Sequence, residues 1–400
     1  TGVQNVLIGG LAGDALTTGN YNVAVGTYAL STENTYGRNV AIGYSTLNAL
    51  DAGADAYNVA VGYNAGANVS TGIQNVLIGG LAGDALTTGN YNTAVGHLAL
   101  TTEDGDGYNT AIGAYTLYTQ NAGAAAFNVA VGYNAGFAMT TGIYNTLVGG
   151  LTGDALTSGG SNVAIGYAAL SAEDGHGKNI AIGHQALLTQ NAGADAYNVA
   201  IGYDAGKIVS TGVANILIGG YAGVLLTTGA GNVAIGRSAL GSENAHGRNV
   251  AIGYLALNAQ DAGVDAYNVA VGYETGMTMS TGTNNTFLGT RAGLNTTTGA
   301  SNIAIGYASL YANNVGTQNV AIGQQAMDQN QGGDRSVAIG HHALMTQNPA
   351  VAGTDMYNVA VGFEAGNDIT TGTENTFIGG LAGDALTTGL GNTALGMKAL

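Results

Sequence analysis

The sequence predicts an all-β protein, a parallel β-solenoid of about 23 coils that are 17–22 residues long. The main observation is a five-residue phrase that begins with Asn, ends with Gly and has apolar residues or Thr between them. It occurs 23 times from Asn5 to Asn392, and Ser336 is the one exception in the Asn position. Successive Asn residues lie 17, 17, 19 and 17 positions apart, which makes a 70-residue super-repeat. Self-similarity at such a period is typical of solenoids, in which each repeat is one stacked coil.

The repeat runs through residues 1–400 without a linker, so we predict a single continuous domain. Super-repeats begin near residues 1, 71, 141, 211 and 281, and a partial repeat begins at 371. The fifth super-repeat is longer by 20 residues, which are one inserted 17-residue coil and a turn lengthened by three. This turn contains the only proline, Pro349, and we expect a local protrusion there.

Each phrase predicts one short strand. In Val40-Ala41-Ile42 the apolar residues alternate with period two, and Gly43 interrupts the chain before a helix could form. Glycine permits a sharp bend and a close backbone approach, while Asn tolerates left-handed backbone angles and can form a hydrogen-bonded ladder. The structural positions of the first coils are therefore Asn22, Gly26, Asn39, Gly43, Asn58 and Gly62.

The two faces of the strand lead to a prediction about assembly. We expect Val40 and Ile42 to fill the coil, which turns Ala41 outward. This middle column becomes large in every fourth coil, at Leu7, Leu77, Leu147, Leu217, Phe287 and Phe377. An outward apolar stripe predicts lateral association, most simply with further copies of the same chain. At ~4.8 Å per coil, the stack predicts a rod roughly 110 Å long.

Charge and composition exclude several classes of partner. The net charge is −16, and the eight basic residues are scattered along the chain, so the surface repels nucleic acid. No apolar run approaches the ~20 residues of a membrane span, and we predict no membrane insertion. The hydrophobic content of 46% argues against disorder.

The repeat resembles known fibrous proteins. Asn-Val-Ala-Ile-Gly, followed by Ala-Leu, is similar to the head repeat of YadA-like trimeric autotransporter adhesins, and Ser336 to Gly340 matches their Ser-Val-Ala-Ile-Gly form. The phrase from Asn109 to Gly113 is similar to repeats of bacteriophage tail fibres. The resemblance covers essentially the whole chain and implies a left-handed β-roll, a parallel homotrimer and an extracellular, cell-surface or virion location. The coils of this chain are longer than the tightest adhesin-head coils.

These observations predict a structural attachment protein, the rigid trimeric shaft or head of a tail-fibre-like host-attachment device. The alternatives are the head of a bacterial trimeric autotransporter adhesin and a self-assembling extracellular filament subunit. The filament follows from the absence of capping repeats at both ends of the sequence, which predicts either a segment of a longer fibre or end-to-end stacking. The expected partners are further copies of the chain and a cell-surface receptor or glycan.

No enzyme, cofactor or metal site is predicted. The hexad of left-handed acyltransferases fails at Ser31 and Gly37, counted from Val25. A right-handed β-helix remains possible as an architecture, but no clustered carboxylates with a basic partner are evident. The Thr-Thr pairs occur mainly once in four coils, which argues against the continuous Thr row of ice-binding solenoids.

One type of turn is the candidate receptor contact. It recurs every 70 residues and contains an acidic residue at the same place, at Glu33, Glu103, Glu173 and Glu243. A row of such turns could bind by avidity, and the alternative is that the turns are simply solvated. The acidic turn at residues 103–107 lacks the spacing of a calcium loop. His341 and His342 are neighbours on an expected strand and should face opposite ways, which argues against a shared metal.

Overall fold

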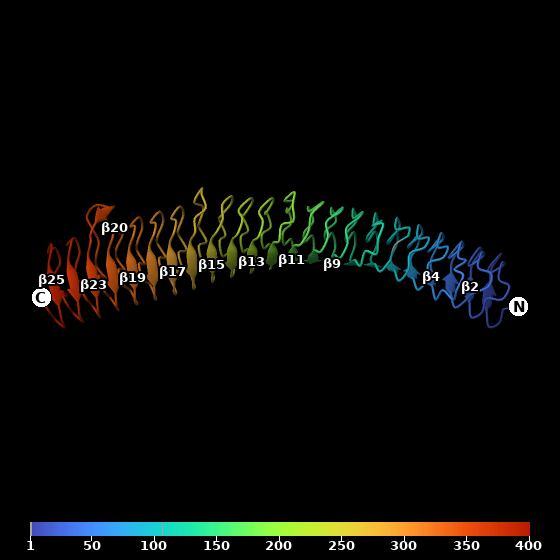
Figure 1. Cartoon of the computed structure of the whole chain (residues 1–400), viewed down its shortest axis with the longest axis horizontal. Helices are drawn as coiled ribbons and strands as arrows, with labels where there is room; N and C mark the ends of the chain where they lie inside the picture. The colour runs from blue at the N-terminus through green and yellow to red at the C-terminus, as the bar shows by residue number, and fades with distance from the viewer. Residues whose placement is uncertain (1, 106) are drawn as a thin grey trace. The chain divides into compact units, whose positions relative to one another are not determined.

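The computed structural model describes residues 2–105 and 107–400. Thr1 of the first super-repeat and Asp106 of the acidic turn therefore lie outside the described residues. The chain divides into two units, the first ending at Tyr197 and the second beginning at Asn198, and each is described by itself. Each unit is an all-β parallel solenoid, and the described residues contain no helix (Figure 1). A single continuous domain stays a prediction.

Every phrase forms a three-residue strand. The strands of the first unit are β1 (Val6–Ile8), β2 (Val23–Val25), β3 (Val40–Ile42), β4 (Val59–Val61), β5 (Val76–Ile78), β6 (Thr93–Val95), β7 (Thr110–Ile112), β8 (Val129–Val131), β9 (Thr146–Val148), β10 (Val163–Ile165) and β11 (Ile180–Ile182). Those of the second unit are β12 (Val199–Ile201), β13 (Ile216–Ile218), β14 (Val233–Ile235), β15 (Val250–Ile252), β16 (Val269–Val271), β17 (Thr286–Leu288), β18 (Ile303–Ile305), β19 (Val320–Ile322), β21 (Val337–Ile339), β23 (Val359–Val361), β24 (Thr376–Ile378) and β25 (Thr393–Leu395), with two-residue strands β20 (Gly333–Asp334) and β22 (Thr354–Asp355).

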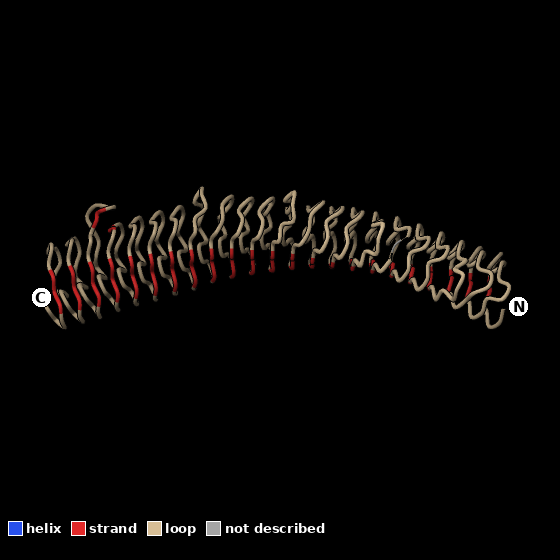
Figure 2. The backbone as a smooth tube through the Cα atoms, in the orientation of Figure 1, coloured by secondary structure: helices blue, strands red, loops and turns tan. Residues whose placement is uncertain are grey.

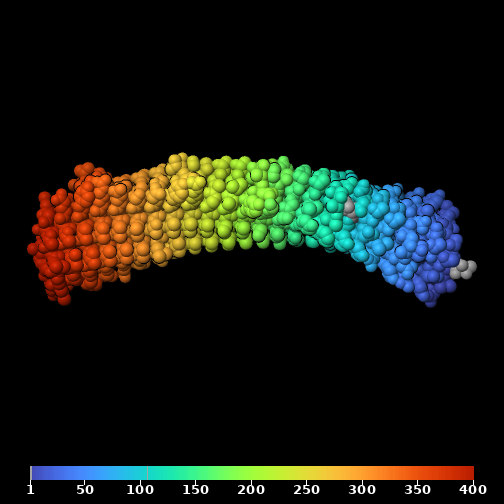
Figure 3. All heavy atoms as spheres, viewed as in Figure 1, coloured from blue at the N-terminus to red at the C-terminus, as the bar shows by residue number. Residues whose placement is uncertain are grey.

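Within each unit, every strand pairs in parallel with the strand of the next coil, phrase on phrase. In β3 and β4, for example, Val40 pairs with Val59 and Ala41 with Ala60. The strands consequently follow one another along one side of the coils, and turns form the rest (Figure 2). In the space-filling view of Figure 3, the atoms of successive coils within each unit lie against one another. This register confirms the predicted parallel β-solenoid, because equivalent residues of successive coils form columns.

The Asn column is a buried hydrogen-bonded ladder, as predicted. The backbone N–H of Asn39 donates to Oδ1 of Asn22 at 3.0 Å, and Asn58 Nδ2 donates to the carbonyl of Gly72 at 2.8 Å. The expected left-handed backbone is not at Asn, however. It lies at the residue before it, as at Tyr21 with φ 60° and Arg38 with φ 64°. Asn is therefore required for its amide, which pairs backbone groups that would otherwise be buried without partners.

The Gly column brings successive backbones into contact. Gly43 has φ +138°, and a Cβ there would lie well inside contact distance of the carbonyl of Gly62 in the next coil. The backbone conformation and the lack of space thus both require glycine, which confirms the predicted bend and close approach.

The predicted orientation of the strands is wrong. Ala41 is fully buried, Val40 is half-buried and Ile42 is 38% exposed. In the other three-residue strands, too, the middle residue is buried and the outer two are half-buried or exposed, except that Leu7 in the first coil is exposed. In about half of the coils the inside also receives an Ala-Leu or similar pair that follows the phrase, such as Ala29 and Leu30, so only a small side chain fits the middle of those strands.

The 70-residue super-repeat has a packing explanation. Where the middle strand residue is large, as at Leu77, the buried Leu of the Ala-Leu pair is replaced by Gly, both in the same coil and in the preceding one. A Cβ at Gly66 would lie 2.5 Å from Leu77 Cδ1, and a Cβ at Gly83 would lie 2.8 Å from Leu77 Cδ2. A large residue in one column therefore replaces a large residue in the other, which keeps the core volume nearly constant.

The lengthened turn of the fifth super-repeat forms the predicted protrusion. Two parallel two-residue strands, β20 and β22, pair Gly333 with Thr354 and Asp334 with Asp355. Figure 1 shows the loop that carries this small sheet extending beyond the turns of the neighbouring coils. The insertion is accommodated outside the coil, so β21 and β23 still pair in register.

A pair of glycine substitutions tests the backbone contact. Gly43→Ala should lower the local free energy of opening by about 3 kcal/mol, because the added methyl group forces adjacent coils apart. Gly53→Ala is the matched control, since Gly53 also has a positive φ of +68° but no atom within 4 Å of a Cβ. Its cost should be about 1 kcal/mol. Hydrogen exchange of peptides that cover residues 37–66 measures the free energy of opening in both variants. An equal loss in the two variants would contradict the proposed backbone contact.

Candidate functional site

The four recurring acidic residues are inside the coils. Glu33, Glu103, Glu173 and Glu243 are all fully buried. Their carboxylates are therefore not on the surface of the chain, and the contact of these turns with a receptor stays a prediction. What these turns expose is neighbouring residues, such as Thr35 and Tyr36 beside Glu33.

The reason is the position of each Glu in its coil. It lies 11 residues after the phrase Asn, and this position forms a buried column in the coils that begin at Asn22 to Asn358. The same position holds Leu50, Val69 and Gln120, all of them buried. The Glu side chains thus fill space that apolar or amide side chains fill elsewhere.

Burial changes the acidity of these carboxyl groups. In two coils the following histidine contributes a backbone hydrogen bond: the N–H of His176 donates to Glu173 Oε1 at 3.3 Å, and that of His246 to Glu243 Oε1 at 3.2 Å. The Oε2 atoms of Glu173 and Glu243 are buried without a hydrogen-bond partner among the described residues. The loss of water raises the pKa of Glu173 and of Glu243 to about 7, and neighbouring aspartates add to the shift.

The outward surface of the strands is uncharged. We call it the strand face, and it consists of the first and third residues of the 23 three-residue strands, such as Val269 and Val271 of β16. All of these residues are Val, Ile, Leu or Thr, and all are half-buried or exposed. No described strand carries Thr at both outward positions, which agrees with the absence of an ice-binding Thr row. A predicted apolar stripe therefore exists, but other residues form it.

Aromatic side chains adjoin the strand face at both ends of the phrase. One row precedes Asn, where Tyr91, Tyr108 and Phe127 stack with ring centroids 5.0 and 4.7 Å apart. A second row follows Gly, where the rings of Tyr44 and Tyr63 stack at 5.6 Å. These exposed rings widen the apolar surface beside the strands.

Most of the positive charge is already paired. Arg38 contacts Asp55 at 3.2 Å and also bonds Tyr57 of the next coil. The same combination of cation, Asp and Tyr recurs at Lys178, Arg248 and Arg335. Exposed ion pairs contribute little stability. Among residues 2–105 and 107–400 there is no cluster of uncompensated positive charge.

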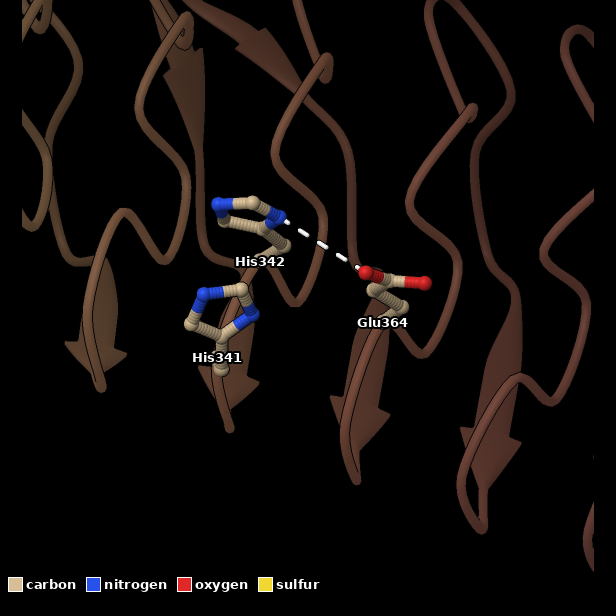
Figure 4. Close-up of side chains that lie close together, drawn as sticks. All are labelled: His341, His342 and Glu364. Atoms are coloured by element: carbon tan, nitrogen blue, oxygen red, sulfur yellow. Dashed lines mark ion pairs between the residues drawn. The ribbon is translucent and has the colours of Figure 1, made fainter.

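One histidine pair contradicts the sequence expectation. His341 and His342 follow the end of β21 rather than lying on a strand, and His342 has φ 56°. Their ring centroids are 3.7 Å apart, so the rings lie side by side instead of facing opposite ways. Glu364 of the next coil completes a group whose possible ligand atoms all lie within 4.8 Å of one another (Figure 4). Two further groups of this kind combine Glu173, Asp174 and His176, and Glu243, His246 and Asp261.

A signal for the His-His-Glu group was present in the sequence. Gln325, His342 and Glu364 each lie six residues after the start of their phrase, in three successive coils. Since equivalent positions stack, this spacing alone predicts that the three side chains are neighbours.

The buried carboxyl groups predict a pH-dependent stability. Their pKa rises from an ordinary value of 4.5 to about 7 in the folded chain, so the folded state binds these protons more tightly than the unfolded state. The stabilisation is complete below about pH 4.5 and is lost as the pH rises to about 7, at a cost of up to about 3 kcal/mol per site. The double variant Glu173→Gln/Glu243→Gln should therefore unfold at higher denaturant concentration than the wild type at pH 8.

Denaturant midpoints by circular dichroism at pH 5 and pH 8 measure this effect. Gln already occupies the same column at Gln120, so the replacement fits the coil. The exposed Glu374→Gln is the control for the removal of one negative charge. The interpretation fails if the double variant and the wild type lose the same stability between the two pH values.

Comparison with known proteins does not identify a family: no protein-family model matches the chain, and no curated protein matches its sequence. Among the described residues there is no helix with the length and apolar character needed to span a membrane. The likeness to YadA-like heads and phage tail fibres therefore stays a prediction from the repeat.

Proposed function

We propose that this chain is part of an extracellular attachment fibre, the rigid trimeric shaft or head of a phage tail-fibre-like host-attachment device. The observation that carries the proposal is the strand face, an uncharged surface of mostly β-branched side chains repeated on every coil. Strands that are apolar on both sides are normally covered on both sides, and a large exposed apolar surface marks an interaction site.

A second copy of the same chain is the partner that fits this surface best. Its strand face has the same spacing of ~4.8 Å per coil, so side chains can interdigitate over many coils in succession. The net charge of −16 makes contact between other surfaces of two copies unfavourable, whereas the strand face carries no charge. Three copies around one axis and a left-handed coil are taken from the resemblance to YadA-like heads.

The mechanism of such a fibre is mechanical. Backbone hydrogen bonds join each coil to the next, and the buried Asn ladder adds a side-chain contribution, so a segment resists bending and proteolysis. The turns vary while the strands are constant, which is typical of binding residues presented on a rigid scaffold. Weak contacts with a receptor or glycan, repeated along three chains, would bind by avidity.

Two alternatives are distinguishable by experiment. Sequencing the residues that flank the repeats in the natural product separates a tail fibre from an adhesin, because an adhesin carries heptads and a membrane-anchoring barrel. Electron microscopy of the purified chain tests the self-assembling filament. Long polymers whose length grows with protein concentration would favour the filament over an attachment fibre of fixed length.

Charged substitutions in the strand face test the proposed assembly. Val269 and Ile303 are 38% and 39% exposed on β16 and β18. The double variant Val269→Lys/Ile303→Lys should shift the chain from trimer toward monomer, because each buried ammonium group would lose its water without a partner. Sedimentation velocity at several protein concentrations measures the molecular mass in solution.

The matched control is Val264→Lys, at a turn residue that is 56% exposed and lies outside the strand face. It introduces the same chemical change and should leave the mass unaltered. A wild-type chain that sediments as a monomer at all concentrations would contradict the proposal, as would a double variant with the wild-type mass.

A further inference from the structure

We propose that His341, His342 and Glu364 form a binding site for a divalent transition-metal ion, with zinc as the expected ion. Their possible ligand atoms lie within 4.8 Å of one another, and His342 Nδ1 is 3.8 Å from Glu364 Oε1. Figure 4 shows both imidazole rings and the carboxylate on the same side of two adjacent coils. This inference does not depend on the proposed attachment function.

The distance between His342 and Glu364 is informative. At 3.8 Å the nitrogen and the carboxylate oxygen are too far apart for a hydrogen bond. Two ligands of one tetrahedral zinc ion, each bound at ~2.0–2.1 Å, are ~3.3 Å apart. The observed separation is thus nearer to that of two ligands of one ion than to the ~2.8 Å of a direct charge-assisted hydrogen bond.

Neighbouring residues orient the two imidazole rings. His342 Nε2 lies 3.1 Å from Gln325 Oε1, and if it donates its proton there, the lone pair of Nδ1 points to Glu364. The ring of His341 stacks on Phe363 with centroids 5.2 Å apart and an angle of 4°. Its Nδ1 is buried and has no hydrogen-bond partner among the described residues, so it is available as a ligand. A hydrogen bond from the second ring nitrogen, such as that of His342 to Gln325, is a regular feature of metal-binding histidines.

The chemistry of the ligands favours zinc over the alkaline-earth cations. Two imidazoles and one carboxylate match the preferences of zinc, whereas calcium and magnesium take oxygen ligands. Three protein ligands leave a fourth position for water. The half-buried Asp328, one coil away, interacts electrostatically with His342 and adds negative charge near the site.

Other histidines of the chain show that a histidine directly after the phrase Gly is not sufficient to form such a group of ligands. His97 and His184 occupy the same position after Gly as His341 does. They are followed by Leu98 and Gln185, so neither has a second imidazole beside it. Only at β21 do two histidines and a carboxylate on the next coil coincide among the described residues.

Metal binding would join the two coils that the longest turn connects. The histidines belong to the coil that begins at Ser336, and Glu364 belongs to the coil that begins at Asn358. Between them lies the longest turn, with Pro349 and strand β22 of the protruding sheet. Because the three ligands come together only in the folded chain, the ion should stabilise this pair of coils.

Zinc titration of the purified chain against a chromogenic chelator tests the proposal. His342→Gln and Glu364→Gln each place at this position the residue type that Gln325 has one coil earlier, so the coil should fold normally. Each variant should lose one equivalent of bound zinc, or at least 100-fold in affinity at that equivalent. Gln325→Ala should weaken it by 10- to 100-fold. Cobalt(II) at the wild-type site should give the visible absorption of tetrahedral coordination.

The controls distinguish this site from the other His-carboxylate groups. His184→Gln, His176→Gln and His246→Gln should all retain the equivalent that His342→Gln loses. Hydrogen exchange should show zinc-dependent protection of residues 340–364 in the wild type and none in Glu364→Gln. The proposal is overturned if His342→Gln binds zinc with the wild-type stoichiometry and affinity, or if only His176→Gln and His246→Gln lose binding.

Discussion

The contact between successive backbones at the phrase Gly is the constraint on which the rest of the structure depends. It requires each coil to lie directly on the previous one, and the Asn ladder prevents a shift along the strand. Since a shift by one residue would reverse every side chain, the two columns together define what is inside and what is outside. The core, the buried carboxyl groups and the strand face all follow from distances counted from the same Asn.

The sequence was sufficient for the fold because its signal is periodic. The number of coils, the strand positions and the protruding turn were all predictable from the spacing of Asn and Gly. The orientation of the strands was not, since alternation separates two faces without indicating which one is buried when both are apolar. The size of the middle residue was the better guide, because Ala41 and its equivalents fit a space that Val40 does not.

The sites were harder to predict for a related reason. An acidic residue in a turn, such as Glu173, looks solvated until its distance from Asn is compared with that of Leu50. The predicted orientation of the His341 and His342 imidazoles is wrong because β21 ends before them, so the alternation of a strand does not apply. In a solenoid, the position within the coil is thus more informative than residue type, and local patterns alone lead to errors at turns.

A large residue in the middle of a strand, such as Leu77, requires glycines at the neighbouring core positions. This requirement limits how such a chain can change in length during evolution. A coil with a large middle residue needs a small partner both within it and before it, so an insertion next to it would leave either a cavity or a clash. A coil with Ala in the middle of the strand and a large residue after the phrase can lie next to another coil of the same type without a cavity or a clash. The fifth super-repeat has three such coils in a row, beginning at Asn302, Asn319 and Ser336, where complete earlier super-repeats have two. The additional coil of the fifth super-repeat therefore lies at a place where the core tolerates it.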